Sequence, residues 1–175
     1  MPSWSEIQLN HQHETDGEHI PYDRRYWTAQ ICLLGHVQHR GFRVIPTEKF
    51  CDCGAETIYQ CLSCHGGIKG AFRSPPKSLD KTPNCCRKCG SPYPWTQTAI
   101  EKVSQAINAS DLSTAEKQDA THELDSIIKN SPGAETAARR THARLAKMGG
   151  LVRAAYNDYV VPLLAETLAK LIKDG

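Results

Sequence analysis

The sequence predicts an α+β protein in which a small β-rich module is followed by a C-terminal helical region. Three observations support this prediction. Seven of the eight cysteines lie in short Cys/Cys or Cys/His pairs between residues 32 and 89. The segment Y-W-T-A-Q-I-C-L-L, which begins at Tyr26, is rich in aromatic and β-branched residues and has the character of a strand. Beyond residue 96, apolar residues recur at spacings of three and four, which is the periodicity of helices.

The length of 175 residues, with 39% hydrophobic residues, suits one domain or a small domain with an appendage. We divide the chain into a polar N-terminal arm (1–25), a β-rich module (26–95), a helical hairpin packed on that module (96–131) and an amphipathic helical tail (132–175). The arm carries three histidines among acidic residues, and we interpret it as a solvated segment rather than a metal site. These histidines are His11, His13 and His19.

Four Cys/His pairs, here called knuckles 1 to 4, carry the chemistry of the module. They read C-L-L-G-H, C-D-C-G, C-L-S-C and C-R-K-C-G. Thiolate and imidazole are the ligands that zinc prefers, and a structural zinc ion is held tetrahedrally by four of them. Two ligands from each knuckle therefore predict two structural Zn²⁺ ions. The predicted metal ligands are Cys32, His36, Cys51, Cys53, Cys61, Cys64, Cys86 and Cys89.

Knuckles 3 and 4 carry the stronger signal, because both have the C-x-x-C spacing. Glycine near the second cysteine permits the positive φ of a tight metal-binding turn, as at Gly54 and Gly90, with Gly66 one position later. Cys85 is interpreted as a spare thiol, although a pairing with Cys89 is a looser alternative. His65 is expected outside the coordination shell, since its site already has four thiolates.

The first site is less regular. Knuckle 2 is a C-x-C, whose loop is more constrained, and His39 is an alternative to His36 as the nitrogen ligand. An empty or distorted site is therefore the competing interpretation of this ligand set.

Two pairings of the knuckles are open. Sequential pairing joins 1 with 2 and 3 with 4, which makes two consecutive zinc ribbons, whereas a cross-brace joins 1 with 3 and 2 with 4, as in RING-type modules. The spacers of 14 residues between His36 and Cys51 and 21 residues between Cys64 and Cys86 suit β-hairpins. They favour sequential pairing.

Three runs of the sequence resemble a known family. The runs A-Q-I-C-L-L-G-H-V, C-G-A-E-T-I-Y-Q-C-L-S-C and C-R-K-C-G-S-P-Y-P-W-T are similar to a bacterial family of uncharacterised double zinc-ribbon proteins, domain of unknown function 2321. The resemblance covers roughly residues 27–130, with a weaker match in the tail, and C-G-S-P-Y-P-W-T at 89–96 is its most specific motif. It implies the same eight ligands and two zinc ribbons, but no activity. The family has C-x-x-C where this chain has Cys51-Asp52-Cys53.

Charge does not argue for a nucleic-acid partner. The net charge is +2, and residues 32–98 carry nine basic and four acidic side chains. Three thiolates around one divalent ion and four around another leave three negative charges, so the metal-loaded module falls to about +2.

Cysteine usage and the N-terminus predict a reducing, cytoplasmic setting. The start M-P-S-W-S-E-I-Q-L-N-H lacks the basic and apolar regions of a signal peptide, and the knuckle spacing is unlike a disulfide framework. No stretch approaches the ~18 uncharged apolar residues of a membrane span.

The helical half shows local start and stop signals. Thr96 is predicted to cap the first helix, with Trp95 and Ile100 as a hydrophobic staple. A capping box at Ser113 and Glu116 opens a second helix that ends near residue 130. In the tail, Gly149-Gly150 marks a break and Pro162 is expected to kink or end the helix.

The tail has a long apolar stripe from Val152 to Ile172. Such a stripe needs a covering surface, supplied by the chain's own helices or by another chain. Two alternatives are therefore open. One is self-association or docking of a protein partner on the stripe, and the other is packing of the stripe within the chain.

We expect a non-enzymatic scaffold for protein–protein interaction, held by two zinc ribbons and carrying a helical assembly tail. The alternative is nucleic-acid binding by side chains of the module, helped by the basic patch at 139–147. Its candidate residues are Arg43, Lys69, Phe72, Arg73, Arg87 and Lys88. A zinc enzyme, with Asp52 or Glu56 near an open first site, is disfavoured, since no H-E-x-x-H or deaminase-type motif is present. A RING-like module is also disfavoured, because it depends on the cross-brace pairing.

Overall fold

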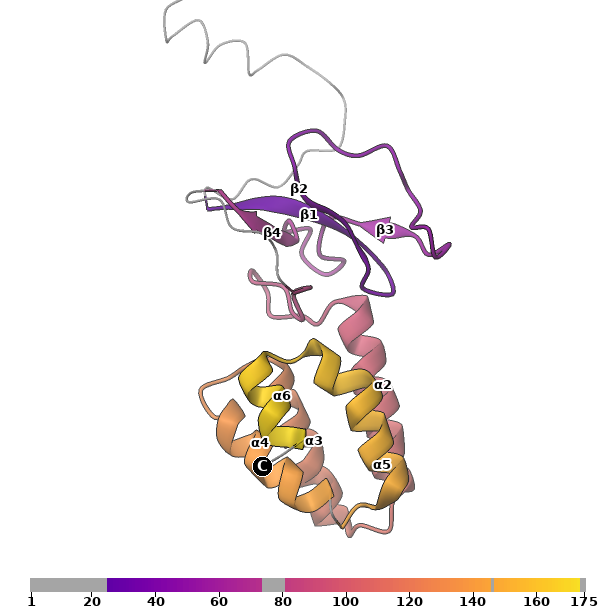
Figure 1. The fold of residues 1–175 in the computed structure, drawn as a ribbon, viewed down its shortest axis with the longest axis vertical. Coiled ribbons are helices and arrows are strands. Elements are labelled where there is room, and N and C mark those ends of the chain that lie inside the picture. The colour runs from indigo at the N-terminus through magenta and orange to yellow at the C-terminus, as the bar shows by residue number, and fades with distance from the viewer. Residues whose placement is uncertain (1–24, 74–80, 146, 174–175) are drawn as a thin grey trace, which may run out of the picture.

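The computed structural model describes residues 25–73, 81–145 and 147–173. Within these residues a small sheet with its knuckles lies at one end of the molecule and a bundle of helices at the other, joined by the chain around residues 81–93 (Figure 1). This order confirms the predicted α+β class. The N-terminal arm and its three histidines lie outside the described residues, apart from Arg25.

Strand β1 (Tyr26–Cys32) is the centre of the sheet. It pairs antiparallel with β2 (Val37–Phe42), β3 (Thr57–Ile58) and β4 (Lys69–Phe72). Its last five residues are all buried, since strands and knuckles cover them on both sides. The alternation expected of a half-exposed strand is therefore replaced by a continuous buried run.

Strand β4 approaches its neighbours closely at Gly70. A Cβ atom there would lie 2.4 Å from the carbonyl oxygen of Arg40 and 2.7 Å from that of Trp27. Both obstacles are backbone atoms, so no side chain fits at this position.

The core of the module is small and includes metal-site cysteines. Ala29, Ile31 and Ile68 are at most 1% exposed and pack with Tyr93 and Trp95. The sulfur-bearing Cys61 and Cys86 complete this cluster. A core of this size supplies little stability by itself.

The first helix, α2 (Pro94–Ala109), starts two residues before the predicted cap. Tyr93 is the N-cap residue and Pro94 is the first helical residue, a position that proline favours because its fixed φ suits a helix and its missing N–H costs nothing there. The prediction of Thr96 as cap was wrong, since Thr96 is buried inside the first turn. Trp95 stacks on Tyr93 at 4.9 Å and donates from Nε1 to the carbonyl of Pro83 at 3.0 Å, which joins the helix to the module.

Helix α3 (Thr114–Ile128) begins as predicted. The N–H of Ser113 donates to the Glu116 carboxylate at 2.9 Å, and the N–H of Glu116 donates back to Ser113 Oγ at 3.4 Å, which completes the capping box. The chain turns at Asn130, whose φ is 50°, and continues into α4 (Ala134–Leu145).

The tail is divided rather than one long helix. It consists of α5 (Gly149–Ala155), a π-helical segment η1 (Tyr156–Val160), a 3₁₀ segment η2 (Val161–Leu163) and α6 (Glu166–Lys173). Pro162 cannot donate a backbone hydrogen bond, so the regular ladder changes pitch before it and the helix ends after it. The predicted interruption at Pro162 is confirmed.

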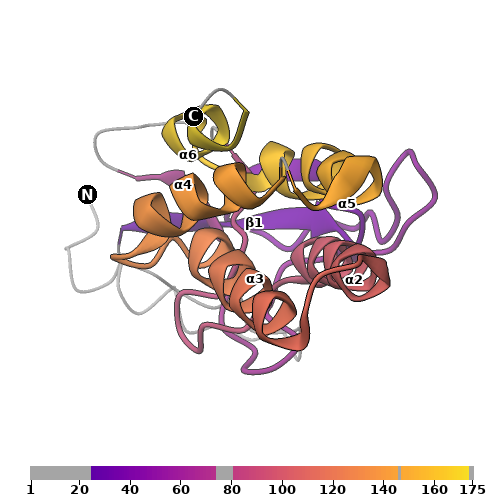
Figure 2. The same ribbon diagram turned by 90° about the horizontal axis from the view of Figure 1, so that it is seen from below.

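The apolar stripe of the tail is buried within the chain. Val152, Tyr156, Val160 and Leu164 are at most 1% exposed, and they share one hydrophobic core with α2, α3 and α4. Seen from the helical end, the helices lie side by side in front of β1 (Figure 2). Of the two alternatives for this stripe, intramolecular packing is the one that the structure shows. Among the described residues, no helix is both long and apolar enough to cross a membrane.

Candidate metal centres

The eight predicted ligands form two separate groups. Cys32, His36, Cys51 and Cys53 lie together, and so do Cys61, Cys64, Cys86 and Cys89. Within each group the four ligand atoms all lie within 4.8 Å of one another. Knuckle 1 therefore meets knuckle 2, and knuckle 3 meets knuckle 4. This is the sequential pairing, and the cross-brace of RING-type modules is excluded.

The separations within the groups fit tetrahedral coordination. Sulfurs at about 2.3 Å from a central ion at tetrahedral angles lie about 3.8 Å apart. In the second group the Sγ atoms of Cys61 and Cys89 are 3.7 Å apart, and those of Cys64 and Cys86 are 3.6 Å apart. Both groups suit a metal ion, since their spacing is too long for disulfides and matches that of a four-ligand cage.

The first group has the same dimensions with one nitrogen. Cys32 Sγ lies 3.9 Å from Cys53 Sγ, and Cys51 Sγ lies 3.8 Å from His36 Nδ1. His36 thus turns its Nδ1 atom to the thiols. Three thiols and one imidazole make a closed set of four donors, so the irregular spacing of knuckle 2 does not distort the site.

Backbone hydrogen bonds explain how a C-x-C loop supplies two ligands. In knuckles 1 and 2 the first cysteine accepts from a glycine three residues later: Gly35 donates to Cys32 O and Gly54 to Cys51 O, both at 2.8 Å. These glycines have φ values of 92° and 82°, which β-carbon sterics disfavour for other residues. In knuckles 3 and 4 the corresponding bond reaches the fourth residue, from His65 to Cys61 O and from Gly90 to Cys86 O.

The first site is therefore built from two short turns and the second from two longer ones. In the short turns the second ligand flanks the glycine, either just after it, as His36 follows Gly35, or just before it, as Cys53 precedes Gly54. A C-x-x-C would place its second sulfur on the glycine position of this turn.

His65 takes the left-handed conformation that was expected of a glycine. Its φ is 54°, whereas Gly66, the residue singled out from the sequence, is not among the positive-φ residues. An L-residue in this region costs roughly 1–2 kcal/mol. The imidazole of His65 is exposed and outside the four-ligand group, as expected.

Backbone amides point at the sulfurs. N–H groups two residues ahead donate to the sulfurs of Cys53, Cys64 and Cys89, from Ala55, Gly66 and Ser91 respectively. Such bonds stabilise the thiolate, which is the form that binds metal. They therefore favour the ionised form of the three sulfurs.

The thiol pKa values differ within each group. The Ser91 hydroxyl and N–H lower the pKa of Cys89 to about 6, and the Ala55 N–H together with the neighbouring Cys51 thiol lowers the pKa of Cys53 to about 7. For Cys64 the Gly66 N–H acts in the same direction, but burial and the three neighbouring thiols raise its pKa to about 12. Each group thus contains one thiol whose pKa its hydrogen bonds lower, Cys53 in the first and Cys89 in the second.

Three supporting residues escaped the sequence analysis. Gln38 on β2 donates from Nε2 to Cys51 Sγ at 2.8 Å. The hydroxyl of Ser91 contacts Cys89 Sγ at 3.3 Å, and the buried Tyr93 hydroxyl bonds to the Cys86 thiol. The last two belong to the motif C-G-S-P-Y-P-W-T, which therefore encloses the second site as well as starting α2. In the sequence, this motif was the signal from which Ser91 and Tyr93 could have been found.

The structure also excludes His39 and Cys85, the two alternative ligands, from the groups. His39 lies outside the first group and faces Glu48, with 3.9 Å between Nε2 and the carboxylate. Cys85 lies outside the second group and packs against the helical core. Burial raises the pKa of the Cys85 thiol, as suits an inert side chain.

The comparison with known families agrees with this architecture. A family described as an uncharacterised protein conserved in bacteria, domain of unknown function 2321, matches residues 25–172. The chain belongs to this family. The match spans the sheet, both candidate metal centres and the helices, so the domain of unknown function 2321 comprises the whole described architecture rather than the ribbons alone. The searches of curated proteins and of solved structures found no match.

Proposed function

We propose that this protein is a non-enzymatic binding module in which two structural zinc ions hold the sheet and the helical bundle supports it. The observation that carries the proposal is the closure of both ligand groups, with four donors each. A catalytic zinc has three protein ligands and keeps one position for water. Four donors at tetrahedral separations leave no such position, which supports a structural role.

Zinc fits these donors better than other biological cations. Thiolates and imidazole are soft or borderline ligands, whereas Mg²⁺ and Ca²⁺ take oxygen. A mixed site of three thiolates and one imidazole beside a four-thiolate site is a common structural zinc pattern. Iron is the competitor for the four-thiolate site, and it absorbs visible light, which zinc does not.

Elemental analysis of the purified full chain tests this proposal. We expect two zinc ions per chain, about one in Cys53→Ser and about one in Cys89→Ser. Cys85→Ser is the matched control, since that cysteine lies outside both groups, and it should retain two. A chain without metal, one that contains iron, or a Cys53→Ser chain that still holds two zinc ions would contradict the assignment.

The partner expected from the sequence is a protein or a second copy of this chain, and fewer residues now support that expectation. The stripe that suggested docking through the tail is buried, but Leu34, Leu151 and Tyr159 remain 63%, 68% and 40% exposed. Leu34 and Tyr159 border a cleft of about 500 Å³ between knuckle 1 and the helices. Light scattering over a concentration series tests self-association: a dimer that Leu151→Ser abolishes supports it, and a monomer throughout rules it out.

A further inference from the structure

We propose that single-stranded nucleic acid binds at the N-terminal end of β1, on a surface here called the β1 face. It surrounds a cleft of about 470 Å³ whose lining includes Tyr26, Trp27, His65, Lys69, Arg87 and Lys88. The inference rests on the proposed function in one respect only, since the second metal centre positions the knuckle that carries Arg87 and Lys88.

Aromatic rings and cations alternate on this face. Lys69 Nζ lies 4.6 Å from the centre of the Tyr26 ring, and the guanidinium carbon of Arg87 lies at the same distance. The guanidinium carbons of Arg43 and Arg73 lie 4.9 and 3.9 Å from the Trp27 ring. A flat ring beside a cation is what a nucleotide needs, because the base stacks on the ring and the phosphate pairs with the cation.

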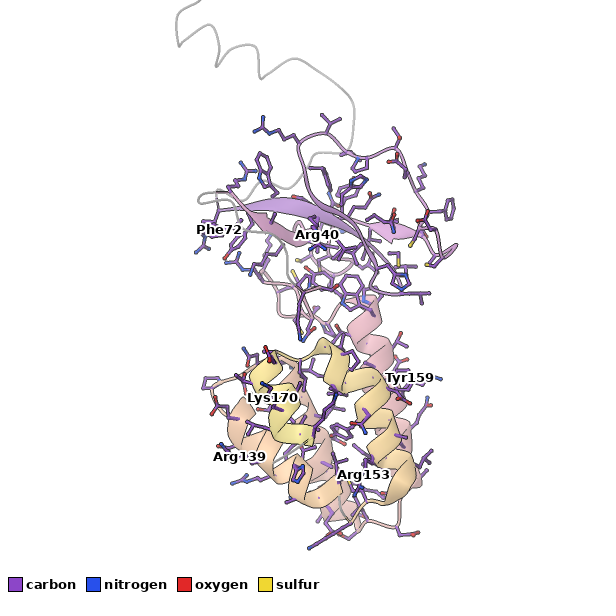
Figure 3. All side chains as sticks on the ribbon, in the orientation of Figure 1. Arg40, Phe72, Arg139, Arg153, Tyr159 and Lys170 are labelled. Carbon is purple, nitrogen blue, oxygen red and sulfur yellow. The ribbon has the colours of Figure 1, made fainter. Side chains whose placement is uncertain are left out.

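These residues come from distant parts of the chain. Lys69 and Phe72 lie on β4, whereas Arg87 lies in knuckle 4, and β4 pairs with β1 so that Tyr26 faces Phe72. The Phe72 ring meets the Tyr26 ring edge to face at 5.1 Å and holds it in place. Figure 3 shows Phe72 at one end of the sheet, among side chains that end in nitrogen.

Charge is segregated along β1. Among the described residues that line the cleft none is acidic. The acidic side chains Glu48, Asp52 and Glu56 belong to the other end of the strand, where Glu48 O accepts from Gln30 and Glu56 O from Leu33. The strand of seven residues separates these ends by about 20 Å. Among the described residues, the N-terminal end of β1 is thus the basic end of the sheet.

Neutralisation of the second metal centre does not account for this basic end. Four thiolates around a divalent ion carry two negative charges, and Arg87 and Lys88 of the same knuckle already balance them. Lys69, which lies on β4, and Arg43, which follows β2, are additional.

A single strand fits this face better than a duplex. A cleft of this volume is of the size that holds a small organic group. Bases within a duplex are stacked on one another and cannot reach Tyr26 or Trp27, whereas an unpaired base can. The basic patch on α4 does not extend the face, because Arg139 lies on the helical half, away from the sheet (Figure 3).

Fluorescence anisotropy with the zinc-loaded full chain tests the proposal. The probes are labelled twelve-nucleotide oligo-uridine, oligo-thymidine and a duplex of the same length, each titrated at 50, 100 and 200 mM NaCl. We expect micromolar binding of a single strand, at least tenfold tighter than that of the duplex. The logarithm of the affinity should fall with the logarithm of salt concentration by about 0.7 for each phosphate contacted. A preference between the two single strands identifies RNA or DNA as the ligand.

Variants separate the two components of the face. Lys69→Gln with Lys88→Gln should weaken binding about tenfold and make the salt slope shallower by about 1.4, since two phosphate contacts are lost. Tyr26→Leu should also weaken binding about tenfold, but with the slope unchanged, because stacking carries no charge. Lys102→Gln with Lys173→Gln is the matched control on exposed lysines of the helical half and should bind as the wild type does.

Three results would overturn the inference: no binding at 50 mM NaCl, duplex bound as tightly as single strand, or equal losses in the face and control variants. The zinc content of every sample is measured in parallel. Two zinc ions without oligonucleotide binding would overturn only this inference, whereas a wild-type chain without zinc would overturn the proposed function.

Discussion

The Sγ atoms of Cys32 and Cys53 lie 3.9 Å apart, although the two residues are 21 positions apart in the chain. Cys32 ends β1, and it pairs with Thr57 on β3. An isolated bridge between Phe50 and Glu56 then folds knuckle 2 back over the end of β1. The first metal centre therefore forms only when β3 has paired with β1, which links metal binding to sheet formation.

Removal of the metal should unfold the sheet and spare the helices. Structural zinc contributes on the order of 10 kcal/mol per site, which exceeds what the small core of the sheet supplies. Among the described residues, the helical core contains none of the eight candidate ligands. After treatment with a strong chelator, hydrogen exchange measured by mass spectrometry should show loss of protection in residues 26–73 and retained protection in α2, α3 and α4. Protected β1 amides in metal-free protein would contradict a structural role for the ions.

Gly70→Ala should destabilise the module. The added Cβ would meet two carbonyl oxygens at 2.4 and 2.7 Å, and both belong to paired strands that cannot move apart without losing hydrogen bonds. We expect a decrease of about 2–3 kcal/mol in the free energy of unfolding, measured by urea titration with zinc present. Gly133→Ala is the control, because its nearest neighbour is Ser126 Oγ at 3.9 Å, and it should change the free energy by less than about 0.5 kcal/mol. Equal changes in the free energy of unfolding for the two variants would show that the paired strands move apart to accommodate the added Cβ atom.

The adjacent glycines at the start of α5 should respond in opposite directions. Gly150 has open space around its Cβ position and lies in the helix, so Gly150→Ala should raise the free energy of unfolding by about 0.5–1 kcal/mol. Gly149 has a φ of 80°, so Gly149→Ala should lower it by roughly 1–2 kcal/mol. Thermal unfolding followed by circular dichroism compares the two variants directly. A stabilising Gly149→Ala would show that this turn does not need its left-handed residue.

Glu123→Gln should change the pH dependence of stability. Glu123 is 5% exposed; burial raises the pKa of its carboxyl above the ordinary 4.5, while Arg144, Thr141 and Arg140 oppose that rise and Asp119 adds to it. The folded state therefore keeps this proton to a higher pH than the unfolded chain does. The stability from this group is complete below pH 4.5 and is lost as pH rises through the raised pKa.

The measurement is the free energy of unfolding of both proteins between pH 4 and pH 8. The advantage of the glutamine variant should grow with pH by about 1.4 kcal/mol for each unit of separation between the two pKa values, then become constant. Comparison with the wild type at each pH cancels the acid sensitivity of the metal centres, which the two proteins share. A difference that does not vary with pH would show that the Thr141 hydroxyl, 3.3 Å from Glu123, and Arg144 fully compensate for burial.

Local features were predictable from the sequence because their causes lie within a few residues. The knuckle spacings marked all eight side chains that the structure gathers, and the capping box at Ser113 and Glu116 located the start of α3. Pro162 marked the interruption of the tail. The start of α2 was misplaced because a threonine before an apolar run resembles a cap, whereas Pro94 and the stacked Trp95 begin the helix earlier.

By itself, then, the sequence determined which side chains gather into metal-sized groups and where helices start or stop, since those depend on short-range geometry. Tertiary structure alone decided which knuckles meet, because strand pairing brings Cys53 to Cys32. It also decided that the chain's own helices cover the apolar stripe of the tail, since periodicity shows that a face is apolar without showing what packs on it. The β1 face has the same origin: Lys69 and Arg87 reach Tyr26 only through the sheet register and the second metal centre, and no segment of sequence contains all three.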